Sequence, residues 1–375
     1  MRRSEWLFVI ILFIFVIASR ALTSGPVYFA DGPRHIASIA NHTYVIQPPG
    51  YWLFNRFGSL FPDPERAFLV FNWLVSAIGS VIFYLLARKF VSETSAKLGA
   101  VLYSVVFFIW FSGNVHSTYA SQLLFPVLAV YLMVRYAEGK ASWIPIALGL
   151  CFAAGAGLRP SDGVFIGPML IYFAIREMSV RDSIKCFSVA FAGCLLWVIP
   201  TFIALHANHR VTFSTQVSTN ALGAIPLGHF NLYTLANFLR YFLPLVVAIG
   251  IIAPFAFLAR SKWLGLLWLW VSVGSIFFVV VYISDAPYLD FMMGGILLLS
   301  LLGMERKLPR IAVNSMICVA ITINLCVYWL FRPLPESGRM RLSDAILNKD
   351  IGMYTHYGVQ HQVMIKLRET AGKAL

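Results

Sequence analysis

The chain has 375 residues, of which 59% are hydrophobic and only 12% are charged, and its formal net charge at pH 7 is +13. Soluble globular proteins carry about 25% charged residues, so this composition excludes an ordinary soluble domain. The basic residues are scattered over short polar segments between apolar runs, which argues against a nucleic-acid-binding protein and fits cytoplasmic loops of a membrane protein.

Apolar runs of about 20 residues recur along the whole chain and predict membrane-spanning helices. We expect an all-α polytopic membrane protein in which residues 1–331 form one transmembrane bundle and 332–375 form a small extracytoplasmic tail. About eleven spans are predicted, at roughly 6–22, 67–87, 97–112, 120–136, 142–157, 163–176, 185–206, 234–258, 263–283, 288–304 and 310–331.

The distribution of Lys and Arg predicts the orientation of the chain. If the N-terminus lies in the cytoplasm, every inside loop is basic, as the positive-inside rule requires. All eight histidines then fall on the opposite side of the membrane. We therefore predict an inside N-terminus, an outside C-terminus and an extracytoplasmic site in a multi-pass protein, and we expect a bacterial cytoplasmic membrane.

The first outer loop, residues 23–66, carries the densest polar pattern. Asp31, Gly32 and Pro33 form a helix-start signal. The polar and apolar residues that follow fall on different faces of a helix, which predicts a short amphipathic helix at the membrane interface. In that helix we expect Ile36, Ile39 and Ala40 on one face, and Arg34, Ser38 and Asn41 on the other. Pro48 and Pro49 then predict an extended segment before Gly50, Tyr51 and Trp52.

Each polar residue of this loop has a simpler interpretation. Asp31 could serve only as an N-cap, worth about 1 kcal/mol. Arg34 and His35 are typical of a solvated helix face, and Tyr51 is typical of an interfacial anchor. From the local sequence alone, the catalytic and the structural interpretations of Asp31 both stay open.

The loop nevertheless resembles a known family. An Asp in the first outer loop, an interfacial helix and a Pro-Pro-Gly-Tyr segment (residues 48–51) are similar to the GT-C superfamily of polyprenyl-phosphate-sugar glycosyltransferases, in particular the protein O-mannosyltransferase and lipid A aminoarabinose transferase type. Residues 113–135 and the segment Gly155–Pro160 also resemble parts of that family, in the same order. The resemblance covers about residues 1–175.

The resemblance implies a GT-C-like fold, an inverting sugar transfer and a lipid-phosphate sugar donor. It also implies that Asp31 is the catalytic base. The sequence departs from the family pattern at two places. The turn at residues 113–117 lacks the second acid of many relatives, and the Arg-Tyr-Leu-x-Pro start of a late span is replaced by residues 286–290, Ala-Pro-Tyr-Leu-Asp.

The expected chemistry requires further residues. Transfer from a lipid phosphate needs a carboxylate that takes the acceptor proton and cationic groups that stabilise the departing phosphate. Arg159 is the first candidate for the phosphate, although a snorkelling arginine at a helix end would look the same. Arg34, His35 and Arg240 are further phosphate candidates; His116 and Tyr51 are other candidate site residues, and Asp290 is a candidate second acid or partner of Arg240.

We therefore predict a membrane hexosyl- or mannosyltransferase that moves a sugar from a polyprenyl-phosphate donor to a lipid, glycan or protein acceptor on the extracytoplasmic face. The alternative is a membrane transporter or a flippase for lipid-linked sugars. Transporters place ionisable residues near the membrane midplane and show internal repeats, and the sequence shows neither. No metal-ligand spacing is present, and no cofactor is predicted; a divalent cation shared with the phosphate is left open.

Overall fold

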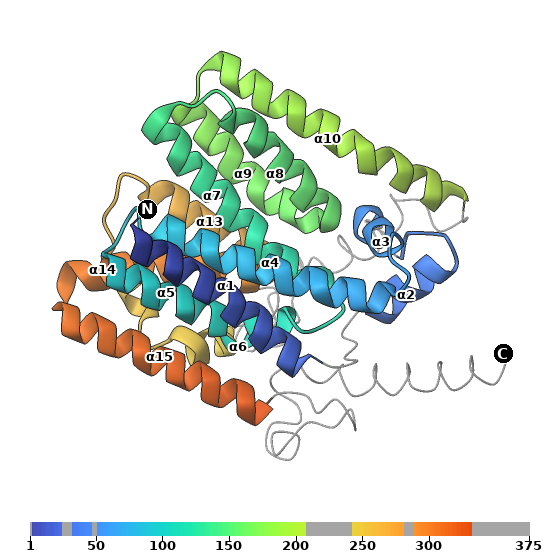
Figure 1. Ribbon diagram of the computed structural model, residues 1–375. Coiled ribbons are helices and arrows are strands. Elements are labelled where there is room, and N and C mark those ends of the chain that lie inside the picture. Colours follow the sequence, from blue (N-terminus) through green and yellow to red (C-terminus); the bar gives the residue numbers. More distant parts are fainter. Residues whose placement is uncertain (1, 25–31, 47–50, 208–241, 281–288, 332–375) are drawn as a thin grey trace.

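The computed structural model describes residues 2–24, 32–46, 51–207, 242–280 and 289–331 (Figure 1). The described residues form helices, turns and loops, and no strand occurs among them. The α-helices are α1 (Arg3–Thr23), α2 (Gly32–Ala40), α3 (Trp52–Gly58), α4 (Pro64–Ala87), α5 (Glu93–Val105), α6 (Phe107–Ser112), α7 (Ser121–Gly139), α8 (Ile144–Leu158), α9 (Pro160–Glu177), α10 (Val180–Ala207), α13 (Leu264–Val280), α14 (Asp290–Lys307) and α15 (Arg310–Phe331), with 3₁₀ helices η1 (Thr118–Ala120) and η3 (Ala253–Leu258).

Length and composition identify the helices that can cross a membrane. Within the described part, five segments are long and apolar enough: Arg3–Thr23, Pro64–Ala87, Thr118–Gly139, Val180–His206 and Arg310–Trp329. Large apolar side chains point outward from them, for example Leu7 and Ile10 on α1 and Leu196 and Ile203 on α10. An outward apolar surface on helices of this length is the face that lipid covers. The prediction of an all-α polytopic membrane protein is confirmed.

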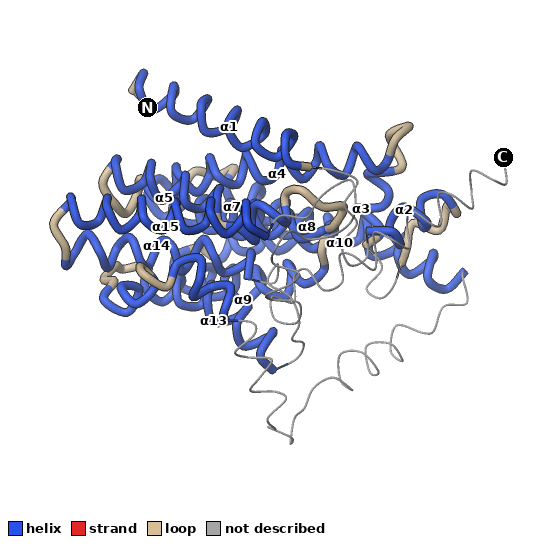
Figure 2. Tube along the Cα trace, turned by 90° about the horizontal axis from the view of Figure 1, so that it is seen from below, coloured by secondary structure: helices blue, strands red, loops and turns tan. Residues whose placement is uncertain are grey.

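The long helices run side by side in one bundle (Figure 1). Helix α1 lies along the outside of the bundle against α4 (Figure 2), and α10 forms another edge of the bundle against α8 (Figure 1). Small residues permit the closest of these approaches, because a side chain at Gly149 would meet the backbone oxygen of Cys186 on α10 at 2.5 Å. Close backbone approach at small residues is the usual way in which helices associate within lipid.

The predicted span at 97–112 is not one continuous helix. It breaks at Val106 into α5 and α6, and side chains from two other helices satisfy the backbone groups that the break releases. The amide of Phe107 donates to Oδ1 of Asn324 on α15 at 3.1 Å, and Arg20 of α1 donates to the carbonyl of Ser104. Buried backbone groups in lipid need such partners, so the break is a stable part of the fold.

The predicted span at 234–258 also differs. Residues 242–249 are helical, a turn follows at 250–252, and η3 completes the segment. Asn324 takes part here too, because its Nδ2 donates to the carbonyl of Ala248 at 2.7 Å. One buried amide on α15 therefore satisfies backbone groups at two helix breaks. Residues 234–241, most of the loop predicted at 207–233, and the tail 332–375 lie outside the described residues.

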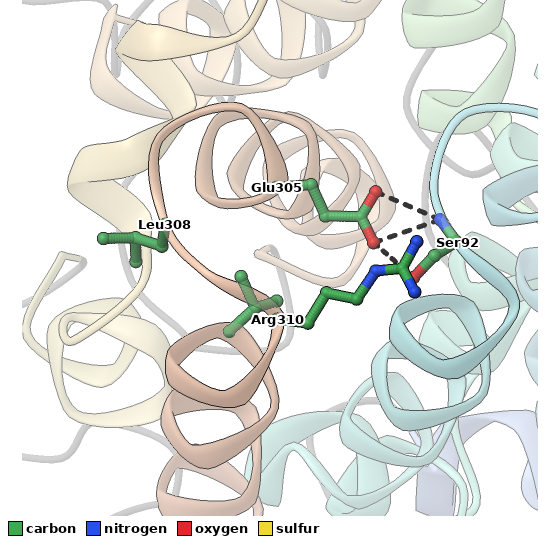
Figure 3. Close-up of a pocket in the computed structure, with 5 residues that line it drawn as sticks. Ser92, Glu305, Leu308 and Arg310 are labelled. Carbon is green, nitrogen blue, oxygen red and sulfur yellow. Dashed lines mark hydrogen bonds between the residues drawn. The ribbon is translucent and has the colours of Figure 1, made fainter.

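The two ends of the bundle differ in charge. The ion pairs found among the described residues lie at the end predicted to face the cytoplasm, for example Lys89 with Glu138 at 2.8 Å and Arg88 with Glu5. At the same end Glu305 accepts from the backbone amide and the hydroxyl of Ser92 and so holds the start of α5, beside a pocket of about 170 Å³ (Figure 3). The opposite end carries α2 and α3 (Figure 1), and we call it the α2 end.

Candidate active site at the α2 end

The two short helices of the first loop are joined by a buried hydrogen bond. Nδ1 of His35 on α2 lies 2.6 Å from Oδ1 of Asn55 on α3. The Asn55 amide nitrogen donates to the carbonyl of Tyr44 at 3.0 Å, so its oxygen is the acceptor toward His35. His35 therefore carries its proton on Nδ1, and the neutral imidazole keeps Nε2 as an acceptor. Asn55 therefore joins α3 to α2 through His35 and to the segment after α2 through Tyr44.

His35 is buried and surrounded by aromatic rings. Its ring meets Phe54 at 4.9 Å and Tyr51 at 5.5 Å, both edge-on. Burial lowers the pKa of His35 to about 4, the hydrogen bond to Asn55 opposes that shift, and the positive charge of Arg159 adds to it. The imidazole is therefore neutral at pH 7, so the interpretation of His35 as a solvated helix-face residue is wrong.

The predicted helix exists as α2, but its faces are assigned differently. His35, Ser38 and Ile39 are buried, at the i, i+3 and i+4 spacing of one helix face. Ala40 is exposed, and so is Arg34. The expected placement of Ser38 on the polar face and of Ala40 on the apolar face was therefore wrong. Ser38 tolerates burial because its hydroxyl donates to the carbonyl of His35 at 2.9 Å.

The first loop also contains strained backbone. His42, Tyr44 and Tyr51 have φ values of 54°, 56° and 54°, in the left-handed region that bulky residues rarely adopt. Tyr51 directly precedes α3, and its half-buried ring contacts His35. Conformations of this kind each cost about 1–3 kcal/mol and tend to gather at functional sites.

A second component of the α2 end is the turn between α6 and η1, residues 113–118. Asn72 of α4, which is fully buried, donates to the carbonyls of Val115 and Ser117 at 2.7 and 3.0 Å. Asn114 donates to Thr23 of α1 and to the hydroxyl of Tyr328 on α15, each at 2.8 Å. Three helices therefore hold this turn.

The turn lies directly against the start of α2. A side chain at Gly32 would meet the backbone oxygen of His116 at 2.5 Å, so only glycine permits this approach. His116 itself is buried. The contact brings the first loop and the 113–118 turn together, although about 80 residues separate them in the sequence.

Arg159 is the third component. It is the single residue between α8 and α9, and Pro160 begins α9 directly after it. The guanidinium donates to Thr118 at 2.8 Å and to Ser161 at 3.0 Å, and it lies over the ring of Tyr119 at 4.1 Å. Only 5% of Arg159 is exposed, so it does not snorkel to the membrane surface.

Two buried acids interact electrostatically with Arg159. Asp162, on the first turn of α9, accepts from Ser121 at 2.7 Å. Asp290 is the first residue of α14, and Arg159 and Arg20 both act on it electrostatically. Both acids are fully buried. A cluster of ionisable side chains of this burial is costly in a membrane protein and generally marks a functional region.

Two of the predicted site residues, Asp31 and Arg240, lie outside the described residues. The pairing of Asp290 with Arg240 is therefore untested. No group of three or more His, Cys, Asp or Glu side chains that could hold a metal ion occurs in the described ranges.

Sequence reasoning missed the buried amides Asn55, Asn72 and Asn114. Asn55 is followed by Arg56 and Asn114 lies in the polar 113–118 turn, but Asn72 stands alone within an apolar run, Phe71-Asn72-Trp73. That isolation was the available signal, because a polar side chain inside a membrane span needs a partner.

Part of the sequence and the fold as a whole are similar to those of known proteins. Residues 46–204 match the sequence model of a family described as dolichyl-phosphate-mannose-protein mannosyltransferase. The matched stretch is less than half of the chain and contains α3, the 113–118 turn and Arg159. A sequence comparison with curated proteins gives no match.

The fold is similar to that of ArnT from Cupriavidus metallidurans. The structure of ArnT bound to undecaprenyl phosphate superimposes with a TM-score of 0.62 at 13% identity, covering 86% of this chain and 64% of that one. The apo structure of ArnT gives 0.59 at 13% identity, covering 85% and 63%. The chain thus spans just under two thirds of the length of ArnT.

The class of protein follows from these findings: an all-α polytopic membrane protein with a GT-C-like fold. The predicted resemblance to the GT-C glycosyltransferases is confirmed by the family match to residues 46–204 and by the shared fold.

Proposed function

We propose that the protein is an integral membrane glycosyltransferase that takes its sugar from a polyprenyl-phosphate donor. The observation that carries the proposal is the placement of Arg159, a buried cation oriented by two hydroxyl groups and a tyrosine ring at the α2 end. A planar guanidinium held in this way suits a phosphate, because its N–H groups can donate in pairs to phosphate oxygens. The ArnT structure that contains undecaprenyl phosphate supports a lipid-phosphate ligand.

In the proposed reaction, Asp31 takes the proton of the acceptor hydroxyl while that oxygen attacks the anomeric carbon. The bond from the anomeric carbon to the phosphate oxygen breaks with inversion, and the polyprenyl phosphate leaves with the electron pair. Arg159 stabilises the charge on the departing phosphate. Asp31 directly precedes Gly32, whose contact with His116 supports a site between the first loop and the 113–118 turn.

The remaining candidates have different proposed roles. Arg34 is exposed on α2 and Arg240 is a cation within a predicted span, and both remain phosphate candidates. His35 is neutral at pH 7, so it offers hydrogen bonding and shape but no charge. His116 lies against Gly32 and Tyr51 contacts His35, and both remain other candidate site residues.

The proposal also includes the orientation of the protein in the membrane and the molecule that accepts the sugar. The Lys and Arg residues gathered at the end away from α2, for example Lys89, Lys97 and Lys185, support a cytoplasmic location for that end. The α2 end, and the transfer, are then extracytoplasmic. A hexose such as mannose is the proposed sugar, and the acceptor is a lipid, glycan or protein.

The test is a transfer assay in membranes that contain the protein. A panel of radiolabelled polyprenyl-phosphate sugars is supplied, and label is followed into lipid, glycan and protein fractions. We expect one donor to give acceptor-bound label that depends on the protein. A transporter would instead move the intact lipid-linked sugar across the bilayer without forming a new glycosidic bond, and that result would overturn the proposal.

A further inference from the structure

A pocket at the end of the bundle away from α2 is lined by two side chains of opposite charge. It has a volume of about 170 Å³ and lies where α5 begins, α14 ends and α15 begins (Figure 3). Its lining residues are Ser92, Glu305, Leu308, Arg310 and Val313. Pockets that hold drug-sized molecules measure about 300–1,000 Å³, so this one admits only a small polar group or one end of a larger molecule.

Glu305 supplies the negative charge of the pocket. It lies on the last turn of α14, and its two carboxylate oxygens accept from the backbone amide of Ser92 at 3.1 and 3.0 Å and from the Ser92 hydroxyl. Because Ser92 is the N-cap of α5, these bonds hold the carboxylate against the start of that helix. A carboxylate has about four acceptor positions, and Ser92 occupies three of them at most. Glu305 can therefore accept a further hydrogen bond from a donor in the pocket.

Arg310 supplies the positive charge. It is the first residue of α15, it is exposed, and its guanidinium extends toward Glu305 and Ser92 (Figure 3). Among the ion pairs of the described residues, none joins Glu305 to Arg310. The neighbouring Arg306 donates instead to the carbonyl of Leu258 at 3.1 Å. The forked N–H groups of Arg310 are thus available to phosphate oxygens, which a guanidinium binds well.

The pocket lies at a membrane surface. Helix α15 is among the helices that are long and apolar enough to cross a membrane. Its 22 residues extend about 33 Å, close to the hydrocarbon thickness of about 30 Å, so its first residue lies at the level of the lipid head groups. Ile311, directly after Arg310, is 82% exposed. The surface that faces lipid therefore begins beside the pocket.

We propose that this pocket binds the head group of a zwitterionic phospholipid that carries a primary ammonium, of the phosphatidylethanolamine type. Arg310 pairs with the phosphate, and the ammonium donates to Glu305. A choline head group has no N–H group and cannot make the second bond, and a glycerol head group has no positive charge to pair with the carboxylate. The site is at the opposite end of the bundle from Arg159, so it is separate from the proposed transfer site.

The experiment compares phospholipids that share their acyl chains and differ in the head group. Purified full-length protein in detergent is titrated with phosphatidylethanolamine, its N-methyl and N,N-dimethyl derivatives, phosphatidylcholine and phosphatidylglycerol, and bound lipid is counted by native mass spectrometry. Phosphatidylethanolamine should bind about tenfold more tightly than phosphatidylcholine or phosphatidylglycerol, because it alone makes both charged hydrogen bonds. The affinity should fall stepwise along the N-methyl series as N–H groups are lost.

Three variants assign the two bonds to their residues. Glu305→Gln keeps an oxygen for the Ser92 amide but removes the charge, so the preference for phosphatidylethanolamine over phosphatidylcholine should fall to about twofold or less. Arg310→Ala should weaken both lipids alike, by about tenfold, because both contain the phosphate. Lys307→Ala is the matched control: it removes an exposed cation of the same turn that does not line the pocket, and the affinities should not change.

Equal affinities for phosphatidylethanolamine and phosphatidylcholine in the unaltered protein would overturn the inference, as would a preference that persists in Glu305→Gln. Tightest binding of phosphatidylglycerol would also overturn it and would indicate a general attraction of anionic lipid to the basic surface. If Glu305→Gln does not fold, the N-methyl series with the unaltered protein still decides. Glycerophosphoethanolamine, the same head group without acyl chains, should not displace the lipid at equal concentration; displacement would show a site for the free ester and contradict the assignment to a lipid.

Discussion

Acidification should loosen the first outer loop, because His35 is buried in its neutral form between α2 and α3. Its pKa in the folded protein is lowered to about 4, whereas a histidine in an unfolded chain titrates near 6.5. Between these values the unfolded loop binds a proton that the folded loop does not, so stability falls as the pH falls. The stabilisation is complete above about pH 6.5 and decreases toward pH 4.

The size of the effect follows from the two pKa values. At pH 5 the loop should lose about 2 kcal/mol of stability relative to pH 7.5. Hydrogen exchange of the amides in residues 32–58 measures this directly, with the free energy of local opening corrected for the intrinsic pH dependence of exchange. The double variant His35→Leu, Asn55→Leu removes the imidazole and its partner together, and it should show no such loss. Identical pH dependence in both proteins would refute the reasoning.

Three further outcomes are expected. Asn324→Leu leaves the Phe107 amide and the Ala248 carbonyl without their partner, so thermal unfolding in detergent should show a loss of about 2–5 kcal/mol; an unchanged Tm would contradict this. Arg159→Lys keeps the charge but not the forked donors, so undecaprenyl phosphate should bind about tenfold more weakly in titrations, and equal affinity would exclude Arg159 from the phosphate site. A reporter at the C-terminus should be active only outside the cytoplasm; activity inside would refute the predicted orientation.

The broad architecture could be predicted because membrane helices depend on apolar length, which is a local property. The helix at residues 32–40 was predicted from a different local signal, Gly32 and Pro33 after an acid. The break at Val106 could not be predicted, since it depends on Asn324, a residue more than 200 positions away. Local sequence gives no information on a partner at that distance.

The site was predicted in part. Arg159 was selected from its motif, but its burial arises from the contacts with Thr118 and Tyr119, which belong to another segment. The faces of α2 were misassigned because Asn55 on α3 turns His35 inward. Hydrophobic periodicity does not detect a buried polar pair of this kind.

The central claim is that sugar transfer takes place beside the first loop with Asp31 as the base, and one measurement tests it most directly. Transfer from the donor identified in the membrane assay is compared between the unaltered protein, Asp31→Asn and Asp31→Ala at equal protein abundance. Asn is as good an N-cap as Asp, so a purely structural role predicts near-normal transfer by Asp31→Asn. The account predicts a loss of about 100-fold or more in both variants, with binding of undecaprenyl phosphate retained, because an amide cannot accept the proton of the acceptor. Normal transfer by Asp31→Asn would contradict it.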